Sequence, residues 1–190
     1  MAPVLAVLVI GLGCWGCAGS GLSGLNGSSG RVGREDSATT RIGVYDSRAV
    51  AVAYAGSKAF KRAFKDSLAA YEHAKFEDDA ARTAEIEAEM QSAQHQMHLQ
   101  AFSTAPVDDI LANIPDEIER IKTEQNLVAL VSKWDEDGLA AYPEAAKIDV
   151  TPALIDAFHP NDRQRKSAEG IQKHKPIPPE EREKELEKGH

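Results

Sequence analysis

The sequence has little cysteine, and both cysteines lie near its start. Cys14 and Cys17 are the only two among 190 residues. The remainder of the chain therefore offers no thiol for a disulfide, a zinc site or a catalytic nucleophile. Aromatic residues make up only 6% of the chain, which favours long helices over a thick core, and the net charge of −8 disfavours nucleic acid as the main partner.

Long apolar segments are also lacking. The apolar run from Val4 to about Leu12 is far shorter than the roughly 20 residues of a membrane-spanning helix. It fits the apolar part of a signal peptide, although no Lys or Arg precedes it and glycines interrupt it. We predict that residues 1–20 are an export signal and that the protein functions in the periplasm.

The processing of this signal has two main alternatives. Cleavage after Ser20 satisfies the rule of small residues at alternate positions, through Ala18 and Ser20, and discards both cysteines. Alternatively, Cys17 is lipidated and tethers the protein to a membrane, with the Gly/Ser-rich segment 21–40 as a flexible linker. An uncleaved apolar anchor is the third, less favoured, alternative.

The segment after the linker alternates between strand and helix signals. Residues 41–46 form a short β-branched run that predicts a strand, with Asp46 or Ser47 capping the helix that follows. From 57 to about 102 there is no Pro or Gly, and we predict two antiparallel helices that turn near 76–82; one straight helix is the competing interpretation. Two shorter helices are expected at about 107–113 and 115–125.

The last third of the chain predicts a small sheet and an unstructured end. Residues 127–132 and 139–142, with the acidic turn 135–138 between them, are typical of a β-hairpin. A short helix is expected over 151–158, with Thr151 as its cap. The charged segment 159–190 has few apolar residues and is predicted to be disordered.

In this order of elements the chain resembles the Skp/OmpH family of periplasmic chaperones. The resemblance covers 41–158 and is carried by residues 41–48, 126–131, 139–142 and 149–155. It implies an α+β, mostly helical fold, with a small β-body and a projecting helical hairpin, the arm (about 57–125). It also implies a homotrimer whose arms surround a cavity for unfolded outer-membrane proteins. One departure from the family's pattern is the charge of the arm, which is acidic here: residues 57–126 contain 8 Lys or Arg and 14 Asp or Glu.

Six apolar residues of the predicted arm are candidates for contact with clients. They recur at helical spacing and include two methionines, which re-pack easily around varied partners. The competing interpretation is a buried seam that holds the two helices together. The six residues are Phe60, Phe64, Leu68, Tyr71, Met90 and Met97.

Other patterns have simpler explanations. A basic face at residues 58, 61, 62 and 65 is interpreted as solvated, His95 and His98 as an exposed pair, and 135–138 as a turn and not a calcium loop. We find no catalytic set, cofactor fingerprint or metal site and predict no enzyme activity. The expected function is ATP-independent holding of unfolded envelope proteins. The alternative is an envelope structural or adaptor protein that binds a folded partner.

Overall fold

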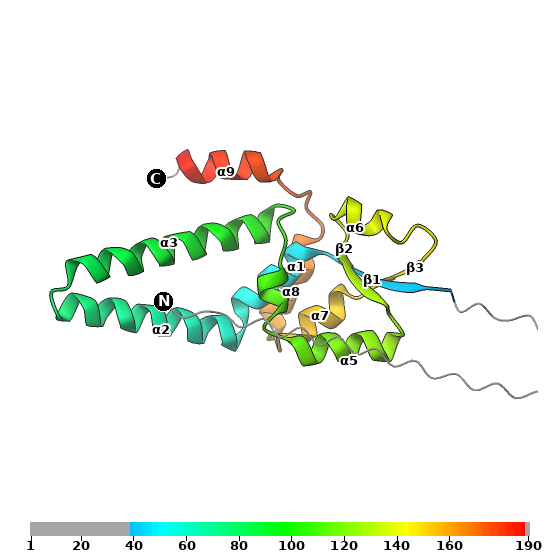
Figure 1. Cartoon of the computed structure of the whole chain (residues 1–190), viewed down its shortest axis with the longest axis horizontal. Coiled ribbons are helices and arrows are strands. Elements are labelled where there is room, and N and C mark those ends of the chain that lie inside the picture. The colour runs from blue at the N-terminus through cyan, green and yellow to red at the C-terminus, as the bar shows by residue number, and fades with distance from the viewer. Residues whose placement is uncertain (1–38, 189–190) are drawn as a thin grey trace, which may run out of the picture. The chain divides into compact units, whose positions relative to one another are not determined.

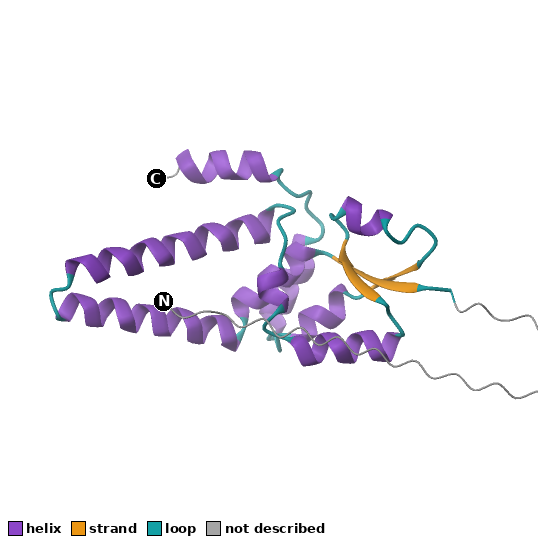
Figure 2. Ribbon diagram, viewed as in Figure 1, coloured by secondary structure: helices purple, strands orange, loops and turns teal. Residues whose placement is uncertain are grey.

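The part of the chain that the structure describes is mostly helical with one small sheet, as predicted for an α+β chain (Figures 1 and 2). The computed structural model describes residues 39–188, with side chains to residue 184. The predicted signal, Cys17 and the linker up to residue 38 lie outside the described residues. The elements are β1 (Arg41–Tyr45), α1 (Ser47–Gly56), α2 (Lys58–Phe76), α3 (Ala80–Phe102), α4 (Asp108–Leu111), α5 (Pro115–Gln125), β2 (Ala129–Ser132), α6 (Glu136–Ala140), β3 (Ala146–Asp149), α7 (Thr151–Ala157), α8 (Asp162–Ile171) and α9 (Pro179–Lys188).

The sheet has three parallel strands in the order β2-β1-β3. Val44 of the central strand lies opposite Val131 of β2 and Asp149 of β3. Because the strands are parallel, their carboxyl ends meet at one edge of the sheet, where ligand-binding and structural polar groups commonly gather in open α/β sheets.

The predicted β-hairpin over 127–142 is wrong. Only its first strand forms, as β2. Asp135 caps a helix instead of closing a turn, since the Gly138 N–H donates to Asp135 Oδ1 at 2.9 Å, and α6 occupies the place of the second strand. The chain then returns as β3, parallel to β1, because a helical crossover brings it back to the same end of the sheet.

Helix α1 forms the centre of the core. Ala49, Val50 and Ala53 are fully buried, and α1 contacts α3, α7 and α8. Asp46 caps the helix as expected, accepting a hydrogen bond from the Arg48 N–H at 3.1 Å. The short alanine side chains let the neighbouring helices approach α1 closely.

Helices α2 and α3 lie side by side after a tight turn at 77–79 (Figure 1). Ser57 separates α1 from α2 and caps α2 through a 3.1 Å bond from the Phe60 N–H. Asp78 adopts a positive φ of 58°, and Asp79 then caps α3. The turn therefore falls within the predicted 76–82, where three consecutive acidic residues provide the left-handed position and the cap.

The disorder predicted for 159–190 is wrong for the helix α8. Asn161 and Gln164 form a capping box, and Gln164 Nε2 also donates to the Gly56 carbonyl at 2.7 Å. Ala168 is fully buried against the core. One alanine face and a good cap thus dock this segment, despite its high charge. Residues 179–188 also form a helix, α9, which contacts α3.

Thr151 does not cap α7 through its side chain. Its hydroxyl accepts a 3.0 Å hydrogen bond from the Asp46 N–H instead, so it ties α7 to the end of β1. Asp149 Oδ1 accepts from the Thr151 N–H at 2.9 Å and fixes the start of the helix. The expected short helix is present, with Pro152 in its first turn.

Candidate functional site

A concave surface lies between α2 and α3, and we name it the arm groove. Its volume is about 970 Å³. It is bounded at one end by Tyr54 of α1 and Asp109 of α4, and its lining is otherwise from α2 and α3. The lining residues are Tyr54, Phe60, Ala63, Phe64, Ser67, Leu68, Tyr71, Glu87, Glu89, Met90, Gln91, Ala93, Gln94, Gln96, Met97, His98, Gln100 and Asp109.

All six residues singled out in the sequence line the arm groove. They come from facing sides of α2 and α3, so the helical spacing did identify one continuous surface. Residues 58, 61, 62 and 65, the basic face of α2, are exposed and do not line it. The contact of this surface with any client stays a prediction.

The middle of the arm is not a closed seam. Phe64 is 52% exposed and Leu68 38% exposed, whereas a packed helix pair would bury them. Burial occurs toward the two ends of the helix pair: Ala74 and Ile86 are covered near the turn, and Leu99 is covered near the core. The helices are therefore held at both ends and leave apolar side chains open to solvent between them.

Polar and aromatic contacts hold each end of the arm groove. Tyr71 Oη donates to Glu87 Oε1 at 2.7 Å and joins the two helices near the turn. At the other end, Tyr54 packs edge-to-face on Phe60 and on Phe158 of the core, with ring centroids 5.6 and 5.7 Å apart. These contacts fix the width of the arm groove without filling it.

The charged groups in the arm groove are acidic. Glu87, Glu89 and Asp109 line it, and none of the described lining residues is Lys or Arg. Burial raises the pKa of Tyr54, and the negative charge of Asp109 raises it further. The negative charge of Asp109 therefore acts on the Tyr54 side chain at the end of the arm groove beside the core.

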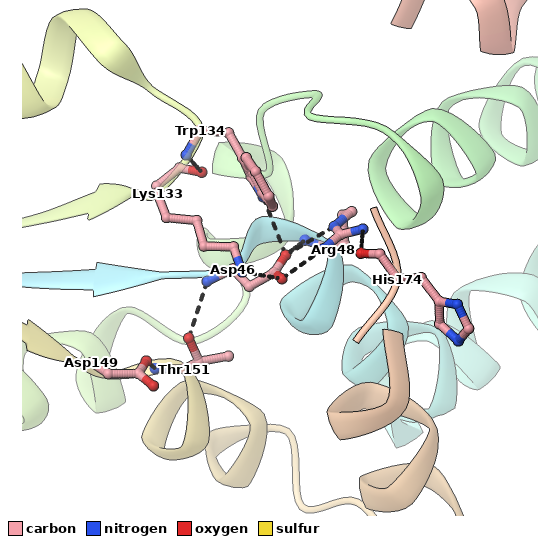
Figure 3. A network of polar contacts seen from close by, with 8 residues as sticks. Asp46, Arg48, Lys133, Trp134, Asp149, Thr151 and His174 are labelled. Atoms are coloured by element: carbon pink, nitrogen blue, oxygen red, sulfur yellow. Dashed lines mark hydrogen bonds and ion pairs between the residues drawn. The ribbon is translucent and has the colours of Figure 1, made fainter. Parts of the chain in front are cut away.

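A second polar arrangement lies at the carboxyl edge of the sheet (Figure 3). The Asp46 carboxylate is fully buried and faces Arg48 at 3.0 Å and Lys133 at 2.7 Å. Trp134 Nε1 donates to its Oδ1 at 3.3 Å, and the Arg48 guanidinium lies 5.0 Å from the centre of the Trp134 ring. Arg48 also donates to the His174 carbonyl at 2.9 Å.

Electrostatics explain why this carboxylate stays ionised. Burial pushes the pKa of Asp46 upward, but hydrogen bonds and positive charge from Arg48 and Lys133 outweigh it, so the pKa lies below its usual value. Both oxygens are already occupied by donors. The network therefore joins β1, α1, the segment after β2 and the segment after α8, and we assign it a structural role.

This network was not predicted from the sequence. Asp46 was expected only as a helix cap, and no role was expected for Arg48, Lys133 or Trp134. A signal was present, since Asp46 and Arg48 stand directly after a buried strand, where charged residues need partners. Trp134 is 88 residues from Asp46, and His174 is 126 residues from Arg48, so these partners are set by the fold.

His95 and His98 do not form a metal site with other side chains. His98 lines the arm groove and packs against Phe102, with ring centroids 6.3 Å apart, while His95 does not line it. Within residues 39–188, no group of three His, Cys, Asp or Glu side chains is placed to hold a metal ion. In the same part of the chain, no helix is long and apolar enough to cross a membrane.

Comparisons with known proteins give no relative. No protein-family model matches the chain, and neither the curated proteins nor the solved structures contain a significant match.

Proposed function

We propose that this protein is an ATP-independent holding chaperone of the bacterial envelope that binds apolar segments of unfolded proteins in the arm groove. The observation that carries the proposal is the exposure of Phe64 and Leu68 inside a groove of about 970 Å³. Apolar side chains in such a surface gain free energy when a partner covers them.

The chemistry of the arm groove suits varied clients. Burying one such side chain completely contributes roughly 1.5–3 kcal/mol, so partly exposed residues give several modest contacts and not one strong one. Met90 and Met97 adapt their shape to the occupant. The groove runs along two helices, and such grooves accept apolar faces of extended or helical segments.

An aggregation assay tests the proposal. An outer-membrane barrel protein is diluted from urea in the presence of the full chain, and light scattering is followed. We expect suppression by the wild type and a loss of most of it in the double variant Phe64→Ser/Leu68→Ser. Both residues are exposed, so far-UV circular dichroism should show an unchanged fold.

Phe76→Ser is the matched control. Phe76 is also a phenylalanine of α2, is 86% exposed, and does not line the arm groove. If Phe76→Ser lost as much activity as the double variant, general surface hydrophobicity and not the arm groove would explain the holding. If the wild type did not suppress aggregation at stoichiometric excess, the structural or adaptor alternative would replace the chaperone proposal.

The proposal includes an architecture similar to that of the Skp/OmpH family. In it, α2 and α3 are the projecting antiparallel arm, and the sheet belongs to the body through which three copies assemble. It is supported by the position of the turn at 77–79 and by the strand β1 running directly into α1. The clients proposed are unfolded outer-membrane or other envelope proteins.

Export is proposed from the first 20 residues, with Cys17 as the lipidation site if the protein is tethered. Mass spectrometry of the N-terminus after expression in a bacterium with an outer membrane distinguishes the two forms. A start at Gly21 indicates a free periplasmic protein, and a diacylglycerol-modified Cys17 indicates a tethered one. An intact Met1 in the mature protein would contradict both.

A further inference from the structure

The charge of the arm groove points to a particular kind of client, and this step rests on the proposed function. We infer that the arm groove selects apolar segments that carry Lys or Arg on both sides of their apolar residues. A groove lined by carboxylates repels acidic flanking residues and attracts basic ones.

The carboxylates lie toward the two ends of the apolar surface. Glu87 and Glu89 lie on the side of Met90 that is toward the turn, and Glu87 is held by Tyr71. Asp109 stands beside the core, where Gln100 Nε2 donates to its Oδ1 at 2.6 Å. Met90 and Met97 lie between these positions along α3.

This arrangement sets a spacing for the client. Glu87 and Gln100, the partner of Asp109, are 13 residues apart in α3, which corresponds to about 20 Å at 1.5 Å per helical residue. An extended peptide covers that length with about six residues. The preferred segment therefore has about six mostly apolar residues with a basic residue at each end.

None of the described lining residues is Lys or Arg. Arg82, outside the lining, pairs mainly with Glu85 and interacts more weakly with Glu89. Lys58, Lys61, Arg62 and Lys65 of α2 lie outside the groove lining. The carboxylates of Glu87 and Glu89 belong to exposed residues, so solvent and salt weaken their attraction, and the preference should decrease as ionic strength rises.

Two fluorescent peptides test the inference against the full chain. They share one apolar six-residue core, flanked by two lysines at each end in the first and by two glutamates in the second. Fluorescence anisotropy at low salt should show about tenfold tighter binding of the lysine peptide, because complementary charge favours one partner and like charge disfavours the other. At 0.5 M NaCl the difference should largely disappear.

Neutral variants assign the preference to the arm groove. In Glu87→Gln/Glu89→Gln, the glutamine at position 87 keeps an acceptor for Tyr71, and the preference should fall to about threefold or less. The control Asp66→Asn/Glu72→Gln removes the same charge from exposed positions of α2 that do not line the groove. It should keep the wild-type preference.

The outcomes separate this inference from the proposed function. Equal binding of both peptides, or tighter binding of the glutamate peptide, overturns the charge selection and leaves apolar binding intact. An equal fall of the preference in both double variants overturns the assignment to the arm groove. Binding of neither peptide overturns the proposed function and the charge selection together.

Discussion

Asp46 and Arg48 form an ion pair of 3.0 Å in which neither side chain has more than 1% of its surface exposed. The pair spans the junction between β1 and α1, two residues apart in the chain. Lys133 adds a second cation to the same carboxylate from the segment after β2. A buried charge of this kind is tolerated only because its partners compensate for the lost hydration.

Replacing Asp46 with asparagine should destabilise the fold strongly. The substitution leaves Arg48 buried without its counter-ion, and breaking a buried pair in this way typically costs about 3–5 kcal/mol. Urea unfolding followed by circular dichroism measures the loss. Asp156→Asn serves as the control, because Asp156 pairs with Arg165 at the surface and its removal should cost less than about 1 kcal/mol. Equal effects of the two variants would contradict the assigned role of the network.

Asp46 should also contribute to acid unfolding. Its pKa is lowered in the folded state, so the folded protein favours the charged form. The stabilisation is complete above the unfolded pKa, at about pH 4, and is lost as the pH falls through the lower folded value. The free energy of unfolding of the wild type should therefore decrease more steeply below pH 4 than that of Asp46→Asn. Parallel curves would show that Asp46 has no such linkage.

Tyr45 should make the free energy of unfolding decrease as the pH rises, which is the opposite of the effect of Asp46. Burial, together with the negative charges of Asp108 and Asp135, raises the pKa of Tyr45 to about 12. The neutral form is favoured on folding, so the stabilisation is present below about pH 10 and is lost as the pH rises toward 12. Between pH 8 and pH 11 the wild type should lose about 1.4 kcal/mol more than Tyr45→Phe. Tyr142→Phe, which leaves Tyr45 in place, should behave like the wild type.

Local chemistry made part of this fold predictable. The strand before Asp46, the turn near 77–79 and the short helices after 107 and 115 all follow from caps, prolines and apolar spacing. The parallel sheet was not predictable in this way, because the pairing of β1 with β3 depends on segments about 100 residues apart. The helix α6 was missed because an acidic run ending in glycine fits a hairpin turn as well as a helix start. For the arm groove, spacing identified six lining residues, but whether the helices close over them depends on packing at both ends.

Two glycine substitutions should change stability in opposite directions. A Cβ on Gly43 would lie 2.5 Å from Leu130 Cδ2 and 3.0 Å from side-chain carbons of Leu127 and Val150. Gly43→Ala should therefore destabilise the protein by about 1–3 kcal/mol through overpacking. Gly170 of α8 has no atom within 4 Å of the added Cβ, and Gly170→Ala should stabilise by roughly 0.5–1 kcal/mol. The midpoint of thermal unfolding should fall in Gly43→Ala and rise in Gly170→Ala. A higher midpoint for Gly43→Ala would contradict the close packing of Gly43 in the sheet.

We propose that the edges of the sheet take part in the proposed trimer, whose three copies are an expectation from the resemblance to the Skp/OmpH family. In the order β2-β1-β3, each outer strand has one side without a strand partner among the described residues, and such edges favour pairing with another chain. Val128, which precedes β2, is 57% exposed, so assembly through this edge would cover it. Sedimentation equilibrium at micromolar concentration should give three times the 20.5 kDa of one chain, less any residues removed at the N-terminus.

Val128→Lys should weaken this assembly, because it places a charge where the edge would be buried. Phe76→Ser is the control, because Phe76 lies at the end of α2, far from the sheet in sequence. Lys147→Ala is not suitable, because Lys147 lies within β3, the other outer strand. Phe76→Ser should keep the wild-type mass. A clean monomer for the wild type would remove the trimer from the proposal while leaving the arm groove as a binding surface of a single chain. Loss of assembly in Phe76→Ser but not in Val128→Lys would place the interface on the arm and not on the sheet.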